Sequence, residues 1–196
     1  MKTTTEAIVL GLHKHSDKLS MLHVYSRTEG RLTLQVYGAN SKHKIRAAFQ
    51  PLSVVEITYD ANPARTIPVL SAIDSVYLPE QVYNDVRKQS ITIFVTEVLT
   101  LTLTHPMEDV RIYQFIDDFV HELNGNPSPE NMHILFLIRL GELLGIGSPD
   151  IAEEGLSLLT RSQRQQMLRT LCDYYLTHLD SFRQPKSLDI LIEVFD

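Results

Sequence analysis

A change in the spacing of apolar residues near position 79 constrains the fold of this 196-residue chain most strongly. Before that position, apolar and polar residues alternate, as they do in 32–37 and 54–59, and turn residues interrupt the pattern at short intervals. Such alternation is typical of strands with one buried face. After that position, apolar residues recur at the helical spacing i, i+3, i+4. The sequence therefore predicts an α+β protein in which a strand region precedes a helical region.

Five alternating segments make up the first region, and they are expected at 4–12, 19–26, 31–38, 52–59 and 67–77. The segments between them, including 38–50, are expected to be loops. A sandwich usually needs about seven strands, whereas a small barrel can be built from five. The prediction for residues 1–79 is therefore a five-stranded OB-fold barrel, an architecture that can bind nucleic acid.

Residues 80–196 predict an all-α domain suited to docking other proteins. Segment 81–104 is rich in Ile, Thr and Val, which favours a strand locally, but about 25 residues without Gly or Pro favour a helix. Apolar spacing predicts another helix over 112–123. Capping residues are expected at three places, which are Ser128 with Pro129 for a helix start, Gly145 for a helix end, and Thr160 with Gln163 for a capping box.

The net charge of −6 argues against a protein that binds nucleic acid through general basicity, but the charge is segregated. Residues 1–80 hold nine Lys and Arg against seven Asp and Glu, whereas residues 81–196 hold nine against seventeen. The densest positive cluster lies in the expected loop between the third and fourth strands. Six residues are therefore candidates for binding DNA: Lys42, His43, Lys44 and Arg46 in that cluster, and Arg27 and Arg31 around a nearby turn.

A basic lip on a barrel can hold phosphates while bases stack on aromatic rings. From spacing alone, a DNA-binding loop and a solvated loop that only keeps the protein in solution are equally good interpretations of this cluster. Lys14, His15 and Lys18 in the first turn are further candidates. No stacking residue is assigned, because the faces of the strands that carry Tyr25, Tyr37 and Tyr59 are left open.

Catalytic and metal-binding patterns are sparse. The sequence contains no Walker-type loop, G-x-S-x-G or H-E-x-x-H motif, and the single Cys172 cannot form an intramolecular disulfide or a thiolate zinc site. The pair His13 and His15 is too few ligands for a metal, and adjacent acidic residues diverge on a helix. We therefore expect no enzyme, no cofactor and no metal. The apolar stretch near the N-terminus is too short for a signal peptide or a membrane span, which predicts a cytoplasmic protein that does not contact membranes.

Several segments resemble the family of the DNA repair and recombination mediator RecO. In the first region these are Tyr-Ser-Arg-Thr-Glu-Gly-Arg-Leu at 25–32 and Tyr-Gly-Ala-Asn-Ser-Lys at 37–42, together with 6–10, 17–19 and 50–52. In the second region, 136–146 resembles a helix of that family that ends in a leucine-glycine turn, and 168–179 with 186–188 resembles its C-terminal helical segment.

The resemblance implies an OB-fold joined to a helical domain, without enzymatic turnover. It implies a protein, monomeric on its own and associated with the nucleoid, that binds single- and double-stranded DNA and anneals complementary strands. It also implies contacts with RecR and with the acidic C-terminal tail of single-stranded-DNA-binding protein, in order to load the recombinase RecA. The family's basic loop falls on Lys42, Lys44 and Arg46, and its basic turn residue falls on Arg31.

The chain departs from the family in two ways. The four-cysteine zinc module of some members cannot be rebuilt from Cys172 alone, and the segment between Gly147 and Leu156 is shortened. Two other functions therefore stay open. One is a protein-interaction adaptor whose barrel does not bind DNA, and the other is a hydrolase or nuclease that uses scattered acidic and histidine side chains.

Overall fold

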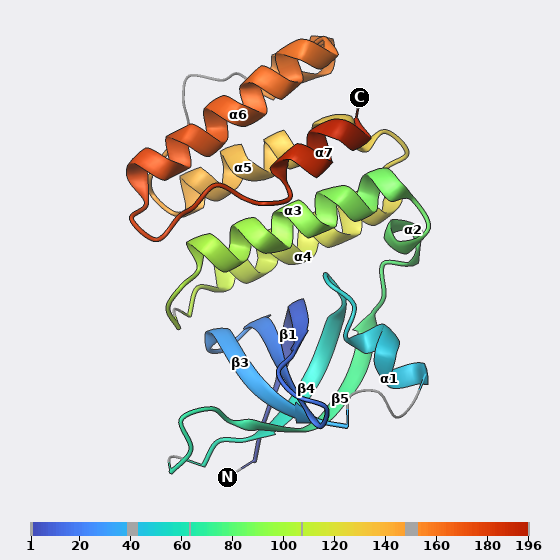
Figure 1. Ribbon diagram of the computed structural model, residues 1–196, viewed down its shortest axis with the longest axis vertical. Helices are drawn as coiled ribbons and strands as arrows, with labels where there is room; N and C mark the ends of the chain where they lie inside the picture. Colours follow the sequence, from blue (N-terminus) through green and yellow to red (C-terminus); the bar gives the residue numbers. More distant parts are fainter. Residues whose placement is uncertain (1, 39–42, 63, 107, 148–152, 196) are drawn as a thin grey trace. The chain divides into compact units, whose positions relative to one another are not determined.

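A closed five-stranded barrel forms the first part of the chain, in the computed structural model that describes residues 2–38, 43–62, 64–106, 108–147 and 153–195 (Figure 1). Its strands are β1 (Lys2–Lys14), β2 (Leu19–Ser26), β3 (Gly30–Tyr37), β4 (Val54–Asp60) and β5 (Val69–Tyr77). The order around the barrel is β1-β2-β3-β5-β4, and β1 also pairs with β4. This arrangement confirms the predicted OB-fold.

The long strand β1 closes the barrel because it pairs with two strands, β2 and β4. Its first part, Lys2–Ile8, pairs with β4, and its second part, Ala7–Lys14, pairs with β2. The register shifts between Val9 and Gly11, and such a bulge bends a strand and increases its twist. One strand can therefore follow the curve of the barrel from one partner to the other.

The barrel core explains why one expected loop contains a helix. Helix α1 (His43–Ala48) lies within the segment 38–50 that was expected to be a loop between strands. Ala48 and Phe49 at its end are buried with Val9, Leu22 and other apolar residues of the strands. Alanine favours helices, and burial of these two side chains compensates for the low intrinsic stability of such a short helix.

The second part of the chain is helical, as predicted. Its helices are α2 (Glu80–Tyr83), α3 (Val86–Thr102), α4 (Val110–Gly125), α5 (Met132–Leu143), α6 (Arg161–His178) and α7 (Leu188–Val194). The strand-like segment 81–104 is indeed helical, but it is divided at Asn84 and Asp85. The Asp85 carboxylate accepts a hydrogen bond from the backbone N–H of Arg87 at 2.8 Å, which starts a new helix.

Two of the three predicted caps are present. Thr160 and Gln163 form the reciprocal capping box of α6, and Gly145 has the positive φ of 76° that a helix end requires. Ser128 stands at the predicted N-cap position before Pro129, but the helix that begins there is the short 3₁₀ helix η1 (Pro129–Asn131), and the Ser128 side chain makes no capping hydrogen bond. The backbone N–H of Ser128 instead donates to the Asn126 side chain at 2.8 Å, and α5 begins only at Met132.

The chain divides into two compact units, which differ from the boundary expected after residue 79. The barrel unit comprises Met1–Pro79 together with Leu103–Val120, and the helical unit comprises Glu80–Thr102 together with His121–Asp196. Within the helical unit, α5 contacts both α3 and α6, and α3 contacts α7 (Figure 1). In the described part of the chain, none of the helices has the length and apolar character needed to cross a membrane.

Candidate nucleic-acid interface

The outer surface of strands β2 and β3 is the first candidate for a binding face. Leu22 and Val24 of β2 and Leu34 and Val36 of β3 point into the core. The alternate residues therefore point outward, since side chains alternate between the two faces of a strand. Four cross-strand pairs line this surface, in the order Tyr25 with Arg31, His23 with Thr33, Met21 with Gln35, and Leu19 with Tyr37. In OB-folds the corresponding surface is where oligonucleotides bind.

Leu103 and Asp109 of the same unit contact one end of this face. The Tyr25 hydroxyl donates to the carbonyl oxygen of Asp109 at 3.4 Å, and the Arg31 guanidinium donates to the carbonyl oxygen of Leu103 at 3.4 Å. Burial lowers the pKa of Arg31, although a guanidinium stays protonated at neutral pH. Burial and the nearby Asp109 charge raise the pKa of Tyr25 to about 12. Arg31 is therefore a partly covered cation with a partner inside the protein.

Arg27 follows β2 and has contacts of its own within the barrel unit. Its guanidinium forms an ion pair with the Glu6 carboxylate at 3.4 Å and lies 5.9 Å from the centre of the Tyr113 ring. Its side chain is still half exposed. The β2–β3 hairpin thus brings Arg27 and Arg31 to one end of the barrel, as the sequence predicted for a turn.

The basic cluster 42–46 is only partly described. Lys42 lies outside the described residues, and the backbone of His43 and Lys44 belongs to α1 while their side chains lie outside the description. Arg46 stands in the last turn of α1 and is exposed. Lys44 and Arg46 therefore belong to a helix rather than to the open loop that the sequence predicted.

His23 lies in the middle of the β2–β3 face, next to His13 of β1. The Nδ1 atom of His23 hydrogen-bonds to the Thr33 hydroxyl at 2.9 Å, and the His13 and His23 ring centres are 5.2 Å apart. Burial, then the Arg31 charge and then His13, lower the pKa of His23 to about 4, so this ring is neutral at neutral pH. Within the described residues, no group of three or more His, Cys, Asp and Glu side chains could hold a metal ion.

The other end of the face opens onto a hollow of about 710 Å³. It lies between the end of β3 and the chain that leads into β5, and Tyr37 is 60% exposed beside it. Its lining residues are Gln35, Tyr37, Arg65, Thr66, Ile67 and Val69. Sequence reasoning did not find this place, although the outward position of Tyr37 could have been read from its alternation with Leu34 and Val36.

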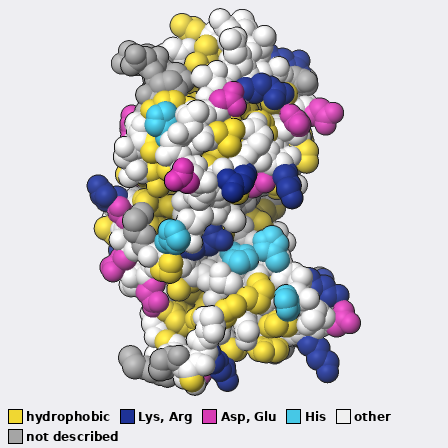
Figure 2. Space-filling model, turned by 60° about the vertical axis from the view of Figure 1, so that its left-hand side comes forward, with side chains coloured by type: hydrophobic (Ala, Val, Ile, Leu, Met, Phe, Trp, Pro, Cys, Tyr) yellow, Lys and Arg dark blue, Asp and Glu magenta, His cyan; other side chains and the backbone are white. Residues whose placement is uncertain are grey.

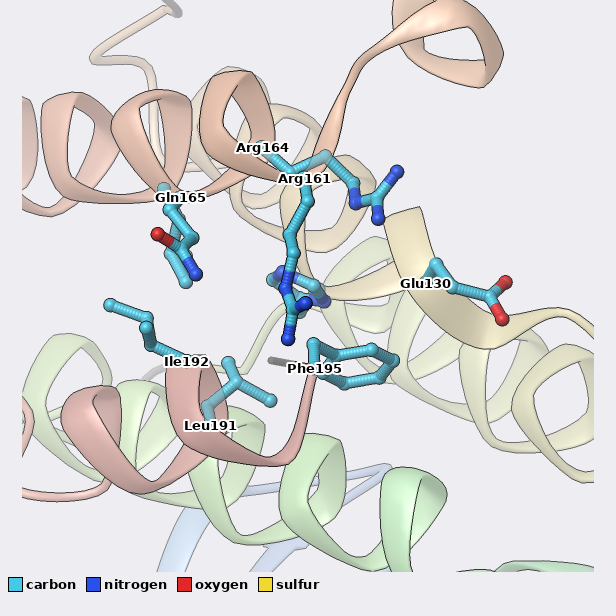
Figure 3. Close-up of a pocket in the computed structure, with 9 residues that line it drawn as sticks. Glu130, Arg161, Arg164, Gln165, Leu191, Ile192 and Phe195 are labelled. Atoms are coloured by element: carbon cyan, nitrogen blue, oxygen red, sulfur yellow. The ribbon is translucent and has the colours of Figure 1, made fainter.

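A second, narrower hollow of about 20 Å³ lies in the helical unit. Figure 3 shows side chains from α6 on one side of it, side chains from α7 on the other, and Glu130 of η1 at one end. Arg161 and Arg164 give this hollow a cationic lining beside the buried His133, Leu191 and Phe195. Its volume has room for about one water molecule. The acidic helical unit thus contains a local site rich in arginine.

Charge is distributed rather than concentrated on one visible face of the protein. On the face shown in Figure 2, Lys and Arg side chains are scattered among Asp and Glu side chains.

The thiol of Cys172 is buried in the helical unit, and burial, followed by the Asp173 charge, raises its pKa to about 12. A thiol in this state is not a nucleophile at neutral pH.

Comparison with known proteins identifies the relatives of this chain. Residues 1–78 match the sequence model described as recombination protein O N terminal. The chain is 26% identical over 237 residues to the DNA repair protein RecO of Flavobacterium johnsoniae and 26% identical over 245 residues to that of Porphyromonas gingivalis. It is 24% identical over 242 residues to that of Bacteroides fragilis.

Each of these three alignments covers 100% of both chains. The alignments extend over 237 to 245 residues, whereas this chain has 196. The relatives therefore carry residues that this chain lacks. The segment predicted to be shortened, between Gly147 and Leu156, falls largely outside the described residues. The match of the barrel to the N-terminal sequence model and the matches along the whole chain agree, and both show that this chain is similar to RecO proteins.

Proposed function

We propose that this protein is a non-enzymatic DNA repair and recombination mediator that binds single- and double-stranded DNA and promotes strand annealing. The observation that carries the proposal is the closed OB-fold barrel, whose β2–β3 face has arginines at one end and an exposed aromatic residue at the other. Relatives named DNA repair protein RecO align along the whole chain, which supports the same role here.

The proposed DNA contacts are electrostatic and moderate in number. Lys42, Lys44 and Arg46 would hold phosphates with His43 beside them, and Arg27 and Arg31 would add charge near the β2–β3 turn. Annealing requires that two strands be held weakly enough to exchange, and the intramolecular partners of Arg27 and Arg31 suit this requirement. If about four phosphates are neutralised, the logarithm of the affinity for single strands falls with the logarithm of salt with a slope of about −3.

A triple substitution tests this assignment. Replacing Lys42, Lys44 and Arg46 with Ala is expected to weaken oligonucleotide binding, slow annealing and make the salt slope less steep. The matched control replaces Arg169, Arg183 and Lys186, three exposed cations of the helical unit, and so removes the same charge elsewhere. If the basic-cluster variant bound and annealed oligonucleotides as well as the parent does, the assignment of this cluster to DNA binding would be contradicted. Complete absence of a mobility shift at low salt would instead favour an adaptor that does not bind DNA.

We further propose that the helical unit docks RecR and the acidic C-terminal tail of single-stranded-DNA-binding protein, and so helps to load recombinase. The arginines of the hollow between α6 and α7 support this placement, because an acidic tail needs a local cationic site in an otherwise acidic unit. The hollow is narrow, so docking there requires side chains such as Phe195 to move.

An annealing assay on strands coated with single-stranded-DNA-binding protein tests the docking proposal. Annealing is expected to be supported when that protein has its tail and to be lost when the tail is deleted. Replacing Arg161 with Ala should reduce the difference between the two conditions, whereas annealing of bare strands should stay unchanged. Equal annealing with and without the tail would contradict docking of the tail. Cleavage of DNA in the presence of a divalent metal would contradict the non-enzymatic assignment.

A further inference from the structure

The hollow at the open end of the β2–β3 face has the parts needed to hold one nucleotide. We propose that it is a stacking subsite for single-stranded DNA, in which a base lies on the Tyr37 ring and the Arg65 guanidinium contacts a neighbouring phosphate. This inference rests on the proposed binding of DNA, and it adds a specific subsite away from the basic cluster 42–46. Neither residue is among the predicted contacts.

Tyr37 is placed for this role by the geometry of β3. It is the last residue of the strand, it points to the outer face, and it is 60% exposed. Its hydroxyl donates to the Gln35 side-chain oxygen at 3.4 Å, which ties the ring along the surface of the strand. Of the four tyrosines on the strands, Tyr25 and Tyr59 are about 1% exposed, and Tyr77 at the end of β5 is partly buried. Tyr37 is therefore the strand tyrosine whose ring is most accessible to a ligand.

Barrel closure brings a cation to the same place. The backbone N–H of Gln35 donates to the carbonyl oxygen of Pro68 at 2.9 Å, and Gln35 pairs with Val69 where β3 meets β5. The connection from β4 to β5 is thereby held beside Tyr37. It carries the exposed Arg65, whose backbone N–H donates to the carbonyl oxygen of Asn62 at 3.0 Å. An aromatic ring and a guanidinium from separate segments thus line one hollow.

The chemistry of the lining fits a nucleotide without sequence preference. A volume of about 710 Å³ lies within the usual range of ligand sites. Stacking on an aromatic ring accepts any base, and OB-folds use this same face and the connection between their fourth and fifth strands to bind oligonucleotides. Bases in a duplex are already paired and stacked, so the subsite should accept single strands and not duplexes.

A single introduced tryptophan provides a direct test, because the chain contains none. In a Tyr37→Trp variant, addition of a single-stranded oligonucleotide should quench the tryptophan emission, and a blunt duplex of the same length should not. The matched control is Ile190→Trp, at a 54%-exposed position of α7 in the helical unit, where no quenching is expected. Equal quenching at both positions would contradict a local stacking contact.

Affinity measurements on further variants separate stacking from charge. Tyr37→Ala should weaken binding of single strands about fivefold or more, with an unchanged salt slope, whereas Tyr37→Phe should bind like the parent. Arg65→Ala should reduce the salt slope by about 0.7. Retained affinity in Tyr37→Ala together with no quenching in Tyr37→Trp would overturn the subsite while the proposed function stood. If the parent bound no single-stranded DNA under any salt condition, the proposed function and the subsite would both be overturned. Quenching by an acidic peptide but not by DNA would overturn the subsite by identifying a protein ligand.

Discussion

At the scale of single residues, His133 links the stability of the helical unit to pH. Its side chain is 4% exposed, and its Nδ1 atom has no hydrogen-bond partner among the described residues. Burial, followed by the Arg164 charge, lowers its pKa from 6.5 to about 3. The unfolded chain therefore binds a proton as the pH falls below 6.5, whereas the folded chain does not until a much lower pH. Protonation favours unfolding. The stability that neutral His133 contributes is therefore fully present above pH 6.5, and it decreases as the pH falls below that value.

We predict that a change from about pH 7 to about pH 5 costs the protein about 2 kcal/mol of unfolding free energy through this residue. A His133→Leu variant should lose less stability over the same interval, because leucine has no proton to gain. Urea denaturation at both pH values measures the difference. A variant whose loss of stability between the two pH values equals that of the parent would contradict this role of His133.

At the scale of elements, the end of α5 depends on a glycine inside the helix. The Gly141 carbonyl accepts hydrogen bonds from the backbone N–H groups of Ile146 and Gly147 at 3.1 and 3.2 Å. A Cβ added at Gly141 would meet the Gly147 carbonyl oxygen well inside van der Waals contact and would lie 3.4 Å from the Tyr175 hydroxyl. Close approach of the returning chain, and not backbone flexibility, therefore requires glycine at this position.

We predict that Gly141→Ala destabilises the helical unit by about 1–3 kcal/mol, because the turn after α5 must shift to admit the methyl group. Gly125→Ala is the matched control, since a Cβ at the end of α4 meets no atom within 4 Å. That change should be neutral or stabilise by up to about 1 kcal/mol. Thermal melting followed by circular dichroism compares the two variants, and equal effects would show that the close contact at Gly141 has no cost.

At the scale of the whole molecule, the barrel unit is not a continuous piece of the chain. Residues Leu103–Val120 belong to it, and they provide the carbonyl groups that Tyr25 and Arg31 contact. We predict that a fragment of residues 1–79 has a lower melting temperature than the full chain and binds a hydrophobic dye, because it exposes Tyr25. Adding a peptide of residues 103–120 should reverse part of both changes. A fragment that melts like the full chain and binds no dye would contradict this dependence.

Alternation agrees with the observed exposure of Tyr37 and Tyr59, but it does not account for the burial of Tyr25. Tyr59 follows Val55 and Ile57 at even spacing and is buried with them, whereas Tyr37 alternates with Leu34 and Val36 and faces outward. Tyr25 also points outward by alternation, yet it is 1% exposed. Its cover comes from residues far along the chain, which local spacing cannot reveal.

The sequence by itself determined the five strands, the change to helices after residue 79, two of the helix caps and the OB-fold, because periodicity and capping are local properties of the chain. It also located the cations of the barrel. Only the tertiary structure decided which of them are covered, that Leu103–Val120 joins the barrel, and that Tyr37 and Arg65 line one hollow. Those outcomes depend on closure of the sheet and on contacts between residues distant in sequence, and no short-range pattern encodes either.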